Sequence, residues 1–205
     1  ISAIKWIIKM FLDGDLGPVT EEQANLLRKA YESNEKAISI VSELLLVNKT
    51  EDVTEKEYEM QEINLIELIE NAIFNFSGEA FARGIEVIFL KPQEVLPKVS
   101  GDKEKISVVM QNLLENAIKY SNMHGKVFIT LKHDDGNITF SIKDIGVVIS
   151  EEGKSKIFEK FYRDPDAQKK EAIGSGIGLF TIKKIIERHK GKIWFESTKE
   201  NGTTF

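Results

Sequence analysis

The fold is decided by a helical stretch in the second half of the chain, Gln111-Asn112-Leu113-Leu114-Glu115-Asn116-Ala117-Ile118-Lys119-Tyr120. Asn112, Asn116 and Lys119 are spaced to project from one face of this helix. Another face carries an apolar stripe, formed by Ile106, Val109, Leu113 and Ala117. Two carboxamides one turn apart can offer oxygen atoms to a hard cation such as Mg²⁺, the lysine can meet phosphate charge, and Tyr120 can flank a base. The same pattern also suits an ordinary solvated helix face, so the neighbouring stretches must decide.

A glycine-rich string follows downstream, Gly174-Ser175-Gly176-Ile177-Gly178-Leu179, and leads directly into an amphipathic helix over 180–188. Glycines ahead of a helix expose backbone amides at its positive end, which favours phosphate. The string also fits a dinucleotide fingerprint, but that motif needs a preceding strand within a βαβ unit. A polar loop precedes it here, so the Rossmann interpretation fails on context.

Between these stretches, Asp144 ends an expected strand and is followed by Ile145 and Gly146. An aspartate in this place can accept a hydrogen bond from an exocyclic amine, and a glycine permits close approach of the backbone to a ligand. The same tripeptide also forms many ordinary turns.

The chain from about residue 58 onward alternates strands and helices, which predicts an α+β fold. Strands are expected at 58–63, 85–90, 126–133, 137–144, 192–197 and 203–205, and helices at 64–83, 102–120 and 176–189. The long irregular segment from Ile145 to Gly174 is typical of a lid over a site.

The first fifty residues predict a helical hairpin. Thr20-Glu21-Glu22-Gln23 is a capping box that starts a helix, and Asp13-Gly14-Asp15-Leu16-Gly17-Pro18 breaks the helix before it. The positions of an expected packing seam recur at alternating spacings of four and three. They are Ile1, Ile4, Ile8 and Phe11 in the first helix and Gln23, Leu27, Ala30, Asn34, Ala37, Val41, Leu44 and Asn48 in the second.

Two helices cannot enclose a core, so we expect the hairpin to pair with a second copy as a four-helix bundle. The alternative is that the apolar stripes pack on the chain's own downstream domain. A polar linker over 51–57 separates the two parts, which gives a hairpin domain at 1–52 and a second domain at 58–205.

Composition excludes several classes of protein. The 205 residues contain no cysteine and carry a net charge of -5, without a basic block that would follow a nucleic acid backbone. The three histidines are too scattered for a zinc site. No apolar run is long enough to cross a membrane, so we expect this part to be soluble. Both ends look like cuts within a longer parent.

The order of the motifs resembles that of bacterial sensor histidine kinases. The stretch from Asn112 to Tyr120 is similar to the N box of that family, and Asp144–Gly146 to the first glycine box. Ile157–Arg163 is similar to the F box, Gly174–Leu179 to the second glycine box, and Gly202–Phe205 to the closing motif. The hairpin resembles the family's dimerisation and phosphotransfer domain. The resemblance implies that this part is cytoplasmic and that the parent is anchored in the inner membrane. The resemblance implies a dimeric four-helix bundle followed by the α/β-sandwich Bergerat fold shared with Hsp90.

The resemblance also implies a Mg-ATP site. Asn116 would hold Mg²⁺ with help from Asn112, Lys119 would meet the phosphates and Tyr120 would lie near the nucleotide. Asp144 would recognise the adenine amino group.

Further roles follow for the adenine pocket and the lid. Gly146 would let the backbone approach the base, and Thr203 would support the pocket. Arg163 would reach the γ-phosphate from the lid, so that Lys119 and Arg163 are the expected catalytic groups. Gly174, Gly176 and Gly178 with Leu179 would shape the lid hinge and the phosphate cradle, while Phe158 and Phe161 would pin the lid to the body.

By the same resemblance, the parent transfers the γ-phosphoryl group to a histidine on the hairpin and then to an aspartate of a response regulator. That histidine would lie just upstream of Ile1, so this chain would not autophosphorylate. Val148 departs from the family, because a second glycine normally stands there, and we expect it to weaken ATP binding.

Two other functions stay open. One is a scaffold that works by dimerisation and partner docking with an impaired ATP site. The other is an ATP-hydrolysing relative, but Asn112 stands where those enzymes carry the glutamate that activates water.

Overall fold

The computed structural model describes residues 2–31, 33–34, 37–38, 58–172 and 174–205. At the N-terminal end, α1 (Ser2–Asp13) is followed by a second helix that begins at residue 21. The backbone amide of Thr20 donates to Gln23 Oε1 over 2.8 Å, and that of Gln23 donates to Thr20 Oγ1 over 3.2 Å. The predicted capping box is therefore confirmed.

The two N-terminal helices form the predicted hairpin. Gly14 and Gly17 adopt φ angles of +86° and +104° in the connection, a region that favours glycine. Lys5 Nζ lies 5.5 Å from the centroid of the Tyr31 ring, so the helices lie against each other. Ile8 of α1 is buried. The seam positions from 39 to 48 lie outside the described residues.

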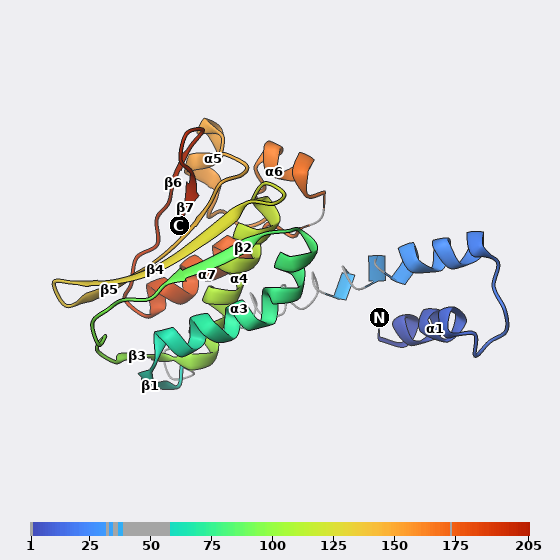
Figure 1. Cartoon of the computed structure of the whole chain (residues 1–205), viewed down its shortest axis with the longest axis horizontal. Coiled ribbons are helices and arrows are strands. Elements are labelled where there is room, and N and C mark those ends of the chain that lie inside the picture. The colour runs from blue at the N-terminus through green and yellow to red at the C-terminus, as the bar shows by residue number, and fades with distance from the viewer. Residues whose placement is uncertain (1, 32, 35–36, 39–57, 173) are drawn as a thin grey trace.

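From residue 58 onward, the chain is built on a five-stranded sheet with the order β2-β4-β5-β7-β6 (Figure 1). The strands are β2 (Glu86–Leu90), β4 (Lys126–Asp134), β5 (Asn137–Asp144), β6 (Glu196–Thr198) and β7 (Gly202–Thr204). β2 runs parallel to β4, and the other pairs are antiparallel. Asp135 and Gly136 both have positive φ angles, which makes the tight turn between β4 and β5. A separate two-stranded sheet pairs β1 (Met60–Ile63) with β3 (Val99–Asp102).

Three helices cover one face of the large sheet and complete the α/β sandwich (Figure 1): α3 (Leu65–Ala82), α4 (Lys103–Tyr120) and α7 (Gly178–Arg188). Asp102 caps α4, since its Oδ1 accepts from the amide of Lys105 over 3.0 Å. The buried side chains of α4 are Ile106, Val109, Met110, Leu113, Leu114, Ala117 and Ile118. Each large one contributes about 1.5–3 kcal/mol by leaving water. The apolar stripe thus anchors the helix and leaves its polar face free for a site.

Three elements were not predicted. One is β3. The other two are short helices, α5 (Glu151–Lys156) and α6 (Pro165–Lys170), and both lie inside the segment expected to be irregular. Helices of six residues are too short to show a 3.6-residue period. They depend instead on their caps, Ser150 and Asp164. The strand expected at 192–197 is also shorter, because regular pairing begins only at Glu196. None of the helices in the described part of the chain has the length and hydrophobicity needed to span a membrane.

Candidate functional site

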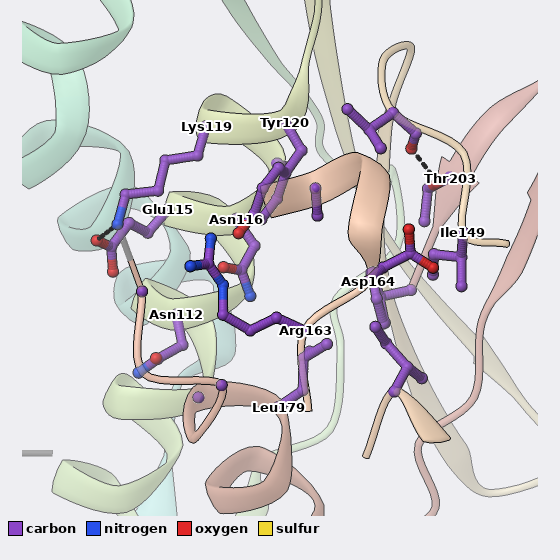
Figure 2. Close-up of a pocket in the computed structure, with 18 of the residues that line it drawn as sticks. Asn112, Glu115, Asn116, Lys119, Tyr120, Ile149, Arg163, Asp164, Leu179 and Thr203 are labelled. Carbon is purple, nitrogen blue, oxygen red and sulfur yellow. Dashed lines mark hydrogen bonds and ion pairs between the residues drawn. The ribbon is translucent and has the colours of Figure 1, made fainter. Parts of the chain in front are cut away.

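A cavity of about 140 Å³ opens between α4, the lid segment and the end of β7 (Figure 2). With the exception of Gly146, the residues predicted for the site line it: Asn112, Asn116, Lys119, Tyr120, Asp144, Arg163, Gly174, Gly176, Gly178, Leu179 and Thr203. They come from α4, β5, the lid, α7 and β7, so the fold gathers positions that are up to 91 residues apart in the sequence, from 112 to 203.

Helix α4 forms one wall of the cavity. The Asn112 side chain is anchored, because its Nδ2 donates to the carbonyl oxygen of Val108 over 2.9 Å. Its Oδ1 then faces the start of α7, where a Cβ atom at Gly178 would lie only 3.0 Å away. Asn116 projects one turn further along the same face (Figure 2). Two amide oxygens thus remain on this wall for a cation or a polar ligand.

Lys119 is paired with Glu115 on the same wall, at 2.5 Å between Nζ and Oε1 (Figure 2). Burial lowers the pKa of Lys119, but the hydrogen bond and the charge of Glu115 outweigh it, so that the pKa is raised overall. Lys119 therefore keeps its positive charge at neutral pH. Glu115 was not predicted as a site residue, although its position four residues before Lys119 on a helix is a visible signal.

Asp144 lines the cavity and is only 4% exposed. Its Oδ1 is buried and has no hydrogen-bond partner among the described residues. Burial raises the pKa of this carboxyl to about 7, with Lys170 acting in the opposite direction. A buried acceptor without a partner costs about 1–3 kcal/mol. A ligand that brings an N–H group to this oxygen would recover that cost.

Gly146 does not line the cavity. Its backbone instead lies close to another segment of the chain, at the end of α4. A Cβ atom at this position would fall 1.8 Å from the carbonyl oxygen of Tyr120 and 2.7 Å from the Cα atom of Ser121. Hydrogen bonds from Asn122 N to Ile145 O and from Val147 N to Tyr120 O, both 3.0 Å, hold the two segments together. The glycine is thus required where the end of β5 crosses the end of α4.

The opposite wall is held by a buried chain of hydrogen bonds. Thr203 Oγ1 donates to the carbonyl oxygen of Val147 over 3.1 Å (Figure 2). Ser197 Oγ lies 2.8 Å from Thr203 Oγ1 and accepts from the amide of Ile149 over 2.9 Å. Because the Thr203 hydroxyl proton goes to Val147, the Ser197 hydroxyl must donate to Thr203. Val148 stands between these two fixed residues, and it lines the cavity.

The Asp164 carboxylate fastens the two short helices of the lid to each other. Its Oδ2 accepts from the amide of Ser150 at 2.9 Å and from the Ser150 hydroxyl at 2.6 Å, and its Oδ1 accepts from the amide of Asp166 at 3.0 Å. Burial would raise the pKa of this carboxyl, but these hydrogen bonds hold it below its usual range. One carboxylate therefore joins the start of α5 to the start of α6.

Arg163, which lies beside Asp164, points along the lid. Its guanidinium donates to the carbonyl oxygens of Ala172 and Glu171. Of the two F-box phenylalanines, Phe158 packs against Phe195 and Phe205, with ring centroids 5.9 and 6.4 Å apart. Phe161 is 60% exposed instead, with a φ angle of +67°. Phe158 pins the lid to the body, as expected, whereas Phe161 faces solvent.

The far end of the cavity suits an anion. Helix α7 begins at Gly178, and no side chain of the described residues caps its first amides. Gly176 has a φ angle of +70° and leaves no room for a Cβ atom, which would lie 2.6 Å from the carbonyl carbon of Phe161. The glycine string therefore brings backbone amides, the positive helix end and Arg163 to one side. The cavity thus offers a buried acceptor from Asp144 and, at the start of α7, donors that suit an anion.

The sequence profile of the histidine kinase-, DNA gyrase B-, and HSP90-like ATPases matches residues 101–205, just over half of the chain. The sensor protein kinase WalK of Staphylococcus saprophyticus is 31% identical over 194 residues, which cover 94% of this chain and 30% of that protein. The chain belongs to the sensor histidine kinases. This histidine kinase core spans between 15% and 48% of the length of the first curated relatives that it matches.

Solved structures agree with the assignment. The histidine kinase ThkA, in a complex with the response regulator protein TrrA, matches the whole chain and is matched over 57% of its own length, with a TM-score of 0.68 and 28% identity. Full-length ShkA in complex with AMPPNP matches 99% of this kinase core over 42% of its own length, with a TM-score of 0.78. At 20% identity, ShkA supports the fold alone.

Proposed function

We propose that this kinase core binds Mg-ATP and transfers the γ-phosphoryl group to a histidine, from which a response regulator aspartate takes it. The observation that carries the proposal is the cavity itself, with the unpartnered Asp144 oxygen at one end and the uncapped start of α7 at the other. The complex of the similar kinase ThkA with a response regulator supports the second transfer.

The residues of the chain would act by binding, orienting and neutralising charge. Asp144 would accept a hydrogen bond from the base amine, while Asn116 and Asn112 would hold Mg²⁺ through their amide oxygens. Lys119 and Arg163 would neutralise phosphate charge, which requires Arg163 to leave the lid carbonyls that it contacts now. Mg-ATP supplies the phosphoryl group and its leaving group.

The acceptor is proposed to be none of the histidines in this chain. Both ring nitrogens of His189 are engaged: Nε2 accepts from the amide of Asp102 at 3.0 Å, and Nδ1 lies 2.8 Å from the carbonyl oxygen of Ile185. His133 pairs with Ile138 in the β4–β5 hairpin, and His124 sits in a turn with a φ angle of +57°. We place the acceptor on the hairpin domain of the parent. In this chain we assign residues 1–52 to the hairpin domain and residues 58–205 to the catalytic domain.

Hydrolysis of ATP by water is disfavoured by Asn112. Its amide nitrogen is tied to the carbonyl oxygen of Val108, and a carboxamide cannot serve as a general base. We therefore expect the isolated chain to show little steady ATPase activity.

The scaffold alternative depends on Val148, because this side chain lines the cavity where the family has a glycine. Mg-ATP should be titrated by calorimetry into the chain, a Val148→Gly variant and an Asp144→Asn variant. We expect Val148→Gly to bind more tightly than the parent and Asp144→Asn to bind at least about tenfold more weakly, equivalent to about 1.4 kcal/mol.

Equal and tight binding by the parent and Val148→Gly would remove the reason for an impaired site. Unchanged affinity in Asp144→Asn would contradict the proposed base pocket. Adding labelled ATP to a longer chain that includes the upstream residues then tests the transfer, because phosphohistidine is lost in acid and phosphoserine is not.

A further inference from the structure

The C-terminal end of the lid helix α6 is fastened to the C-terminal end of α4. Lys170 Nζ donates to the carbonyl oxygen of Tyr120 over 2.8 Å and to that of Ser121 over 2.7 Å. Tyr120 is the last residue of α4 and Ser121 is its C-cap. The last carbonyls of a helix lack partners within the helix and carry its negative dipole end, which a cation stabilises. The lysine therefore completes a helix that ends fifty residues earlier in the sequence.

A second contact supports the first. Arg83, the C-cap of α3, donates from Nη1 to the carbonyl oxygen of Lys119 over 3.3 Å, and its Nη2 lies 3.3 Å from Glu171 Oε2. Glu171 follows Lys170 directly, at the C-cap of α6. The C-terminal end of α6 is thus joined to the C-terminal end of α4 twice. Lys170 makes the contact directly, and Glu171 makes it through Arg83.

The same lysine acts on the base end of the cavity. Asp144 and Lys170 attract each other, which offsets part of the desolvation of both groups. The carbonyl oxygen of Tyr120 accepts from Val147 N as well, so Lys170 shares an acceptor with the wall of the cavity. Lys170 is the charged side chain that acts on this carboxyl, whereas Thr203, which faces Asp144 in β7, is neutral. Arg83 acts on Lys170 as a like charge.

We propose that Lys170 is a positioning residue for nucleotide binding, which seats the lid on the C-terminus of α4 and supplies the counter-charge that lets Asp144 accept from the base. The proposal rests on the function proposed above. It adds a residue that lies outside the five motifs and acts on the base pocket without lining the cavity. Losing Lys170 would loosen the lid and keep the Asp144 carboxyl protonated to a higher pH.

Lys169 provides a matched control on the same helix. Its side chain is 78% exposed and pairs only at the surface with Asp166, at 2.6 Å. Lys170→Met and Lys169→Met are the same substitution at neighbouring positions, but only Lys170→Met removes the hydrogen bonds to Tyr120 and Ser121 and the charge that acts on Asp144. Lys170→Arg keeps the charge, and it should restore most of the behaviour if charge at this place is what matters.

The first measurement is amide hydrogen exchange of the ligand-free chain over residues 151–172. Lys170→Met should exchange at least about tenfold faster than the parent at the end of α6, whereas Lys169→Met should match the parent. Equal exchange in the two methionine variants would overturn the lid contact. This measurement does not depend on nucleotide, so it remains decisive even if the chain binds no ATP.

The second measurement is the affinity for ATP between pH 6 and 9. Lys170→Met should bind about tenfold more weakly at pH 7, and its affinity should recover at higher pH than that of the parent, because Asp144 ionises later. Lys170→Arg should follow the parent. Affinities and pH profiles that coincide for both methionine variants would overturn the counter-charge role. Failure of the parent and Lys169→Met to bind ATP would instead contradict the proposed function.

Discussion

At the scale of single residues, the buried carboxylate of Asp144 destabilises the ligand-free protein, while it provides an acceptor for a ligand. Its folded pKa of about 7 lies above the usual 3.8, so the folded protein holds this proton more tightly than the unfolded chain does. The stabilising contribution of the protonated form is complete below about pH 4 and is lost as the pH rises through 7. Ligand-free protein should therefore lose stability over this window through Asp144.

An Asp144→Asn variant tests this linkage. We expect its free energy of unfolding at pH 8 to exceed that of the parent, by up to about 4 kcal/mol, and the difference to vanish near pH 4. Urea unfolding at the two pH values measures it. Asp135→Asn, a neutralisation in the exposed β4–β5 turn, should change little at either pH. A parent that is more stable than Asp144→Asn at pH 8 would contradict the cost assigned to the buried charge.

Substitution of glycine by alanine should have opposite effects on stability at two positions, Gly146 and Gly78. Gly146→Ala should destabilise the domain by about 3 kcal/mol or more, because the new Cβ atom meets the Tyr120 backbone. Gly78→Ala should stabilise it by about 0.5–1 kcal/mol, since Gly78 lies inside α3 and a Cβ atom there meets no described atom within 4 Å. Thermal unfolding of both variants at one pH measures the contrast. A harmless Gly146→Ala would mean that the glycine serves the ligand and not the packing.

At the scale of elements, the lid depends on its caps more than on its core. Asp164→Ala would leave the amides of Ser150 and Asp166 without their acceptor, and we expect a loss of about 2–3 kcal/mol. Hydrogen exchange over α5 and α6, together with urea unfolding, measures it. Because the pKa of Asp164 is lowered, its contribution is present above pH 4 and is lost in acid.

Asp166→Ala is the control for this variant, since its side chain makes only an exposed pair with Lys169. Its effect should stay within about 0.5 kcal/mol. If Asp164→Ala left the exchange of both short helices unchanged, the double cap would not be what holds the lid.

At the scale of the whole molecule, the N-terminal hairpin exposes large apolar side chains. Ile4, Ile7 and Leu26 remain accessible to solvent although Ile8 is buried. Two helices cannot cover such a surface, and we propose that a second copy covers it as a four-helix bundle.

Sedimentation of the chain should then show a dimer that Ile7→Glu weakens at least about tenfold, because a buried charge would face the partner. Val95→Glu serves as the control, since Val95 is 98% exposed in the other part of the chain. A monomer at high concentration, or equal dimerisation of both variants, would contradict the bundle and favour packing of the hairpin on another surface.

Most elements of the fold follow from local patterns in the chain. The capping box at Thr20, the helices α3, α4 and α7 and the β4–β5 hairpin were predicted from spacing and turn residues, because each signal lies within a few positions. The candidate site residues were named from motif order, and all but Gly146 line one cavity. Their roles toward a ligand remain predictions.

The remaining features depend on where distant segments meet. The partner of Gly146 is the backbone of Tyr120, and the partners of Lys170 are two carbonyls fifty residues away, which no spacing along the chain reveals. The orphaned oxygen of Asp144 is likewise a matter of burial. Motifs record the chemistry that a ligand requires at each position, whereas close approach and desolvation arise when the lid, α4 and β5 pack together.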